Sequence, residues 1–94
     1  MNTTAALTLQ DVTRLATILE WCQHNTHVRW LLPNGNVIGG TVRSVGYENG
    51  NFLRADDDVR GAFVRVTCDT GLERAMSVVG LVALLRRNEI AADR

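Results

Sequence analysis

Lysine is absent from this chain of 94 residues, and its ten basic side chains, all arginines, are balanced by ten carboxylates. A formal net charge of zero excludes the basic excess with which proteins bind phosphate backbones non-specifically. No apolar run approaches the roughly 18 residues that a transmembrane helix needs. The start, MNTTAALTLQ, has neither the basic nor the apolar region of a signal peptide. We therefore expect a cytoplasmic protein with no membrane partner.

Cysteine is scarce, and Cys22 and Cys68 are expected to stay free thiols that pack as small apolar groups. A zinc site that joins them to His24 and His27 is an alternative, but the spacing matches no finger pattern. Three consecutive aspartates at 56–58 lack the alternation of a calcium loop and are typical of a solvated turn. The sequence therefore predicts neither a metal ion nor a cofactor.

Catalytic motifs are also missing from the sequence. It contains no phosphate loop, nucleophile elbow, zincin helix or dinucleotide fingerprint. No pair of titratable residues is spaced for acid–base work. We therefore expect a protein that is not an enzyme.

The length suits a single domain, 1–94, around one hydrophobic core. Residues 1–7 show no periodicity and predict a loose arm. A helix is expected over 8–25, because apolar residues recur at three- and four-residue spacing from Val12 to Cys22. Thr8 is its expected N-cap, Asp11 lies near its positive end, and Trp21 is expected at the edge of the apolar stripe.

From residue 27 the apolar period changes from a helical one to two, which indicates β-strands. Asn34-Gly35 predicts a tight hairpin turn with positive φ at both residues, and Gly39-Gly40 allows the second strand to bend. After an excursion at 46–61, strands are expected at 62–68, 72–79 and 81–85, and the polar tail 86–94 as a frayed helical end. The prediction is a mainly β (α+β) domain, with a bent, five-stranded antiparallel barrel over 27–85 behind the helix.

Segment 31–45 combines a turn glycine and a strand glycine with two apolar residues at a defined spacing, namely Leu32, Gly35, Gly40 and Val42. This spacing resembles the first motif of the Sm-like small barrels, which include the bacterial RNA chaperone Hfq. Where Sm proteins place an Asp and an Asn in the RNA pocket, this chain has Gly46 and a displaced Asn51. The resemblance implies a barrel of the Sm-like or SH3-like kind and a homo-oligomer that binds single-stranded RNA.

Two further groups of residues have a defined spacing: Cys22, Gln23, His24 and Gly35 at the helix-to-hairpin junction, and Gly71, Arg74, Met76, Val78, Leu81 and Leu84 at the final hairpin and closing strand. In both places the chain resembles the Rof-like inhibitors of Rho-dependent transcription termination. This resemblance implies a protein partner in the transcription machinery, engaged by the helix and the adjacent strand edge.

Aromatic residues make up only 5% of the chain, so each one matters as a candidate contact. Trp30 shares a strand face with Val28 and is expected in the core, whereas Tyr47 and Phe52 lie in the excursion and are candidates for contact with a ligand. The candidate partner-binding residues are Arg14, Trp21, Arg29, Arg43, Tyr47, Phe52 and Arg65. We expect a regulatory module that acts through protein contacts, and the alternative is the RNA-binding oligomer with an arginine-lined face.

Overall fold

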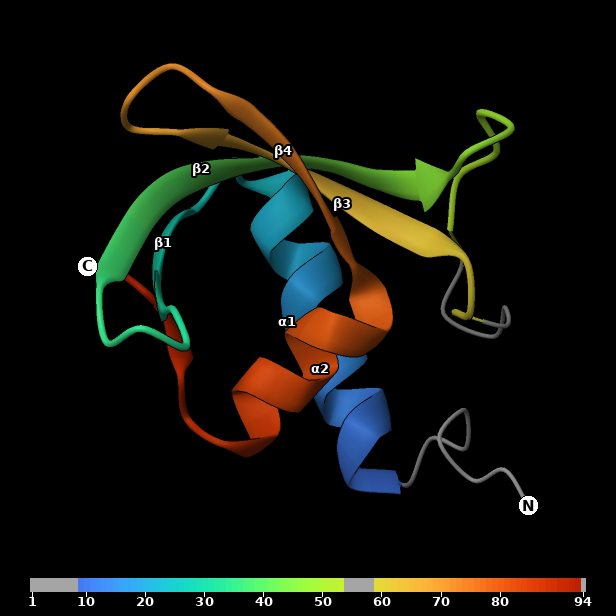
Figure 1. Ribbon diagram of the computed structural model, residues 1–94. Coiled ribbons are helices and arrows are strands. Elements are labelled where there is room, and N and C mark those ends of the chain that lie inside the picture. The colour runs from blue at the N-terminus through green and yellow to red at the C-terminus, as the bar shows by residue number, and fades with distance from the viewer. Residues whose placement is uncertain (1–8, 54–58, 94) are drawn as a thin grey trace.

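The computed structural model describes residues 9–53 and 59–93. Its elements are α1 (Leu9–Gln23), β1 (His27–Leu31), β2 (Val37–Tyr47), β3 (Ala62–Cys68), β4 (Glu73–Ser77), α2 (Val78–Arg86) and β5 (Ile90–Ala92). The five strands form one antiparallel sheet in the order β4-β3-β2-β1-β5. The sheet curves around α1 and α2, which lie on its inner side (Figure 1).

The expected N-terminal helix and five antiparallel strands are confirmed, but the expected closed barrel is wrong. Strands β4 and β5 lie at opposite ends of the sheet order. The core fills the space between the curved sheet and the two helices, and Trp30 contributes to it as expected, with 3% of its surface exposed. Neither described helix is both long and apolar enough to span a membrane.

The buried stripe of α1 is rotated relative to the expected one. Leu15, Ile18 and Trp21 are 2%, 0% and 4% exposed, whereas Val12 is 52% exposed. Trp21 was expected at the edge of the apolar stripe, but it is a core residue. The helix ends at Gln23, and Asn25, two residues beyond it, has a φ of 46°, the left-handed conformation common just after helix C-termini. The expected N-cap Thr8 and the arm 1–7 lie outside the described residues.

The expected hairpin between β1 and β2 is confirmed, but its turn is centred one residue before the expected Asn34-Gly35 pair. The Gly35 N–H donates to the Leu32 carbonyl at 2.9 Å, which places Pro33 and Asn34 at the centre of the turn. Proline suits the first central position because its φ is fixed near the required value. Of the Asn34-Gly35 pair only Gly35 has a positive φ, 89°, so the prediction of positive φ at both positions is wrong.

Strand β2 bends, as expected, but its bulge is not at the glycine pair. The register with β3 shifts between Val42 and Ser44. Gly40 instead allows close packing, because a Cβ there would lie 2.7 Å from a methyl group of Val66. The bulge decides which β2 side chains reach the outer face beyond it.

Residues 78–86 form the helix α2, although a closing strand was expected over 81–85. The Ser77 hydroxyl accepts a hydrogen bond from the Gly80 N–H at 3.0 Å, which is an N-cap. Helical spacing then buries Val78, Leu81 and Val82 against the core. The tail, expected as a frayed helical end, contains β5, which pairs with β1. A short apolar run is compatible with either element, so the cap and the tertiary contacts decide.

Candidate functional site

An open cleft of about 420 Å³ lies on the outer face of the sheet, where β2, β3 and β4 run side by side. Its lining comes from the end of β2, the turn after it, and the facing parts of β3 and β4. The lining residues used below are Ser44, Gly46, Tyr47, Glu48, Phe52, Phe63, Arg65 and Ala75. Both helices pack on the opposite side of the sheet, so they do not cover the cleft (Figure 1).

A tight turn after β2 positions Phe52. The Gly50 N–H donates to the Tyr47 carbonyl at 2.9 Å, and the Tyr47 N–H donates to the Asn51 carbonyl at 2.8 Å. Gly50 has a φ of 89°, a conformation that glycine adopts without strain. The chain therefore doubles back on β2, and Phe52 forms a single antiparallel bridge with Gly46.

Gly46 lies between two phenylalanines in one row across the sheet. It pairs with Phe63 on β3 and bridges to Phe52 on its other side. Directly opposed residues of antiparallel strands project from the same face, so both rings flank the glycine on the outer face. Two strand spacings separate their Cα atoms, which amounts to roughly 10 Å. Because Gly46 has no side chain, the row forms a slot with a backbone floor and two aromatic walls.

The exposure of the two rings is high for their size. Phe52 is 81% exposed and Phe63 is 36% exposed. Phe63 alternates along β3 with the buried Ala62 and Val64, which fixes its direction away from the core. Large apolar side chains gathered in a hollow of the surface are typical of binding sites.

Arg65 occupies the next row of the cleft. It pairs with Ser44 on β2 and with Ala75 on β4, so small side chains flank it on both sides. Its side chain is exposed, and among residues 9–53 and 59–93 none forms a hydrogen bond or an ion pair with it. An uncommitted guanidinium with open space on both sides is suited to bind a carboxylate or a phosphate.

Arg43 lies nearby on the same face, but its side chain already has a hydrogen-bond partner. Its Nε donates to the Thr67 hydroxyl at 3.2 Å, and that hydroxyl donates to a Glu73 carboxylate oxygen at 3.2 Å. This chain of contacts crosses β2, β3 and β4. Arg43 is thus the outer-face arginine with local partners, in contrast to Arg65.

A second polar cluster on the surface surrounds His27. The ring Nε2 lies 2.8 Å from an oxygen of Asp69, and Nδ1 lies 3.1 Å from an oxygen of Asp93. The hydrogen bond to Asp69, reinforced by the charges of both carboxylates, raises the pKa of His27 above its usual 6.5. Arg29 reaches the same Asp93 carboxylate at 3.6 Å. The cluster ties β1 to the β3–β4 turn and to the residue after β5.

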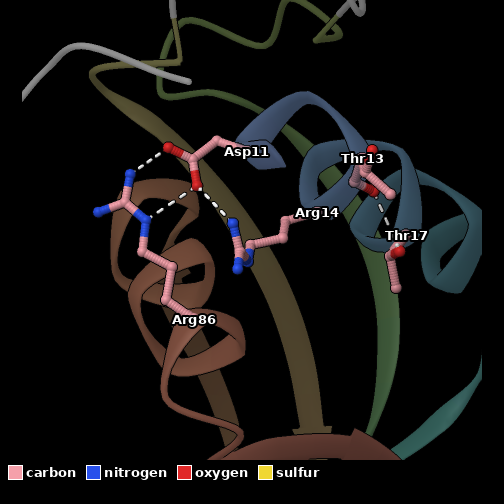
Figure 2. A network of polar contacts seen from close by, with 5 residues as sticks. All are labelled: Asp11, Thr13, Arg14, Thr17 and Arg86. Atoms are coloured by element: carbon pink, nitrogen blue, oxygen red, sulfur yellow. Dashed lines mark hydrogen bonds and ion pairs between the residues drawn. The ribbon is translucent and has the colours of Figure 1, made fainter. Parts of the chain in front are cut away.

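Figure 2 shows a third cluster, in which the Asp11 carboxylate lies between Arg14 and Arg86. Asp11 is fully buried. It accepts hydrogen bonds from Arg14 Nη1 at 3.0 Å and from Arg86 Nε at 2.8 Å, and Arg86 Nη2 donates to its other oxygen. The arrangement satisfies a buried charge, which makes it a structural contact between α1 and α2.

The cysteines do not form a nucleophilic or metal-binding group in the part of the chain that the structure describes. Both are free thiols, with Cys22 half-buried and Cys68 buried. Burial raises the pKa of the Cys22 thiol to about 11, which disfavours the reactive thiolate. No cluster of three or more His, Cys, Asp or Glu suited to a metal occurs among the described residues. The aspartate run at 56–58 lies outside them.

The cleft brings together three of the seven candidate partner-binding residues, namely Tyr47, Phe52 and Arg65. The other four lie elsewhere: Arg14 contacts Asp11, Trp21 is in the core, Arg29 faces Asp93, and Arg43 is bound to Thr67. Sequence reasoning missed Gly46, Phe63 and Ala75 as parts of a site. The sequence did contain one signal for this site: Phe63 is an aromatic residue at a strand position that faces away from the core.

No protein-family model matches this chain, and no curated protein or solved structure matches it either. What is shown is a small α+β protein with an N-terminal helix and a five-stranded antiparallel sheet.

Proposed function

We propose that this protein is a non-enzymatic binding module that docks a partner protein in the cleft on the outer face of β2, β3 and β4. The observation that carries the proposal is the pair Phe52 and Phe63, exposed on either side of Gly46. Aromatic and arginine side chains in a pocket dominate the binding energy of many protein interfaces. The cleft supplies both kinds within one hollow.

The distribution of charge favours a protein partner over a nucleic acid. The chain has no net charge, and of the arginines proposed as contacts Arg29 and Arg43 are engaged with local groups. Glu48 lines the cleft as well. Binding of a nucleic-acid backbone draws on several arginines or lysines without local partners along one track, which the described lining of the cleft does not offer.

The most specific form of the proposal is regulation of transcription termination in the manner of the Rof-like proteins. Its support is the resemblance of 22–35 and 71–84 to that family. Three of the residues that carry it, Val78, Leu81 and Leu84, lie on α2 and not on a strand. The docking surface that we propose is the outer cleft, whereas the resemblance implies the helix and a strand edge.

A second candidate is the Sm-like homo-oligomer that binds single-stranded RNA. Two observations favour association between copies: β4 pairs with β3 alone and β5 pairs with β1 alone among the described strands. Such strand edges are templates for pairing with another chain. Light scattering tests this candidate, because a monomeric mass across micromolar concentrations excludes it.

Selection of peptides by phage display tests the proposed docking site directly. Wild-type protein is the bait, and the enriched peptides are re-tested on two serine variants of exposed apolar residues. Phe52→Ser removes a wall of the slot, and Leu72→Ser is the matched control, since Leu72 is 69% exposed in the turn between β3 and β4. We expect binding to fall tenfold or more on Phe52→Ser and to be unchanged on Leu72→Ser. Equal binding to both variants, or no enrichment, contradicts the proposal.

A further inference from the structure

We propose, resting on the function proposed above, that the cleft binds an extended acidic peptide segment of the partner protein. An apolar or aromatic side chain of that segment enters the slot between Phe52 and Phe63 over Gly46. A carboxylate of the same segment pairs with Arg65. The cleft then recognises two side chains, one by apolar contact and one by charge.

The positions of the two subsites set the spacing in the peptide. Phe63 and Arg65 are two residues apart on β3 and share its outer face. Such residues are separated by roughly 7 Å along a strand. An extended peptide presents side chains on one face at the same interval, so the apolar residue and the acidic residue should be two positions apart.

The charges around the slot give the peptide a preferred direction. Arg65 lies in the row of Ser44, on one side of the Gly46 row. Glu48 follows Tyr47 in the turn, on the other side of Gly46 along the chain, and also lines the cleft. A carboxylate is therefore attracted at the Arg65 end and repelled at the Glu48 end.

Arg65 is available for this role because it has no competing local contact among the described residues. Arg43 differs, since the hydroxyl of Thr67 and, through it, Glu73 hold its side chain. A carboxylate fits the planar fork of an arginine through two parallel hydrogen bonds. One such pair matches the single acidic side chain of the proposed segment.

Fluorescence anisotropy with two synthetic peptide pools tests the inference. Both pools carry phenylalanine at one central position. In the first pool one of the two positions two residues away is Asp or Glu and the other is Ser, and in the second pool that one position is Lys or Arg. The proteins are wild type, Arg65→Gln, Arg65→Glu and Phe52→Ser, with Arg43→Gln as the matched control for loss of an outer-face arginine. Thermal unfolding of each variant checks that it is folded.

We expect wild type and Arg43→Gln to prefer the acidic pool, Arg65→Gln to lose about tenfold in affinity for it, and Arg65→Glu to prefer the basic pool. Phe52→Ser should weaken both pools. If the acidic pool binds in a Phe52-dependent manner but Arg65→Gln binds it as wild type does, this inference fails and the proposed function stands. If display-selected peptides bind through Phe52 while neither pool binds, the inference fails in the same way.

A nucleic-acid ligand is the remaining outcome. Mixed-sequence single-stranded RNA is titrated in parallel on wild type and Arg65→Gln. Binding that is lost in Arg65→Gln and falls steeply with salt would assign Arg65 to a phosphate and overturn the inference. No binding by either pool, by selected peptides or by RNA would overturn both the inference and the proposed function.

Discussion

Asp11 and Arg86 join the first turn of α1 to the last turn of α2 through hydrogen bonds from Nε and Nη2 of the arginine to both carboxylate oxygens, across 75 residues of sequence. The carboxylate lies at the positive end of one helix dipole and the guanidinium at the negative end of the other. The ion pair therefore agrees with both helix dipoles while it fixes the crossing of the two helices beneath the sheet.

Replacing Asp11 should destabilise the fold more than its position in a first helical turn would suggest. Asp11→Asn keeps the shape but loses the charge that satisfies two arginines, and we expect the free energy of unfolding to fall by about 1–3 kcal/mol. Urea denaturation measures the change. Glu20→Gln, on an exposed side chain of the same helix, is the control and should stay within about 0.5 kcal/mol of wild type. Equal effects of the two substitutions would contradict a structural role for Asp11.

The His27 cluster predicts that stability falls as pH rises. Because the pKa of His27 is raised in the folded state, its protonated form stabilises the fold fully below about pH 6.5, and this contribution is lost as pH rises through the folded pKa. The urea midpoint of wild type should decrease over that window. His27→Gln should show a flatter profile, and His24→Gln, on the exposed histidine after α1, should follow wild type. A wild-type midpoint that rises over the same window would contradict this account.

The hairpin at Pro33-Asn34-Gly35 and the alternation along β1 and β3 are local signals, so the sequence predicted them. The helix α2 was not predictable in the same way, because a short apolar run at 81–85 suits a strand or a helix. The Ser77 cap becomes recognisable only when the following residues are seen to pack helically. The strand conformation of Ile90 in the tail was not predictable for a similar reason, because β5 forms by pairing with the distant strand β1.

The candidate site was predictable in part for a related reason. Phe52 and Arg65 were identified from residue type, and the structure places both in the cleft. Their positions relative to Gly46 depend on the register shift between Val42 and Ser44, and no local sequence pattern predicts that shift. The burial of Asp11 was not predictable either, because its place near the positive end of the helix says nothing of the two arginines that surround its carboxylate.

Gly46 should be sensitive to the smallest substitution. A Cβ at this position would lie 2.6 Å from the backbone oxygen of Asn51, so Gly46→Ala must displace the turn that carries Phe52. We expect a loss of about 1–3 kcal/mol in stability together with weakened peptide binding. Gly35→Ala is the control: its φ of 89° makes alanine costly by about 1–2 kcal/mol, but it lies outside the cleft. Unchanged peptide binding by Gly46→Ala would show that the slot does not depend on this backbone.

The Cys22 thiol should react slowly in the folded protein. Its pKa of about 11, compared with 9.0 for an unperturbed thiol, lowers the thiolate fraction near neutral pH by about 100-fold. Alkylation by iodoacetamide, followed by mass spectrometry in a Cys68→Ala background, measures the rate. The folded protein should react at least about 100-fold more slowly than the urea-unfolded chain. Similar rates in the two states would show that the thiol is not protected by burial.

The most direct test of the docking cleft is a two-dimensional amide NMR titration of the wild-type protein with the acidic peptide pool. We predict that the largest shift changes fall on Gly46, Phe52, Phe63, Arg65 and Ala75, with little change in α1 and β5. Changes centred on α1, or on the edge strands β4 and β5 without the Gly46 row, would contradict the claim that the outer-face cleft is where this protein binds.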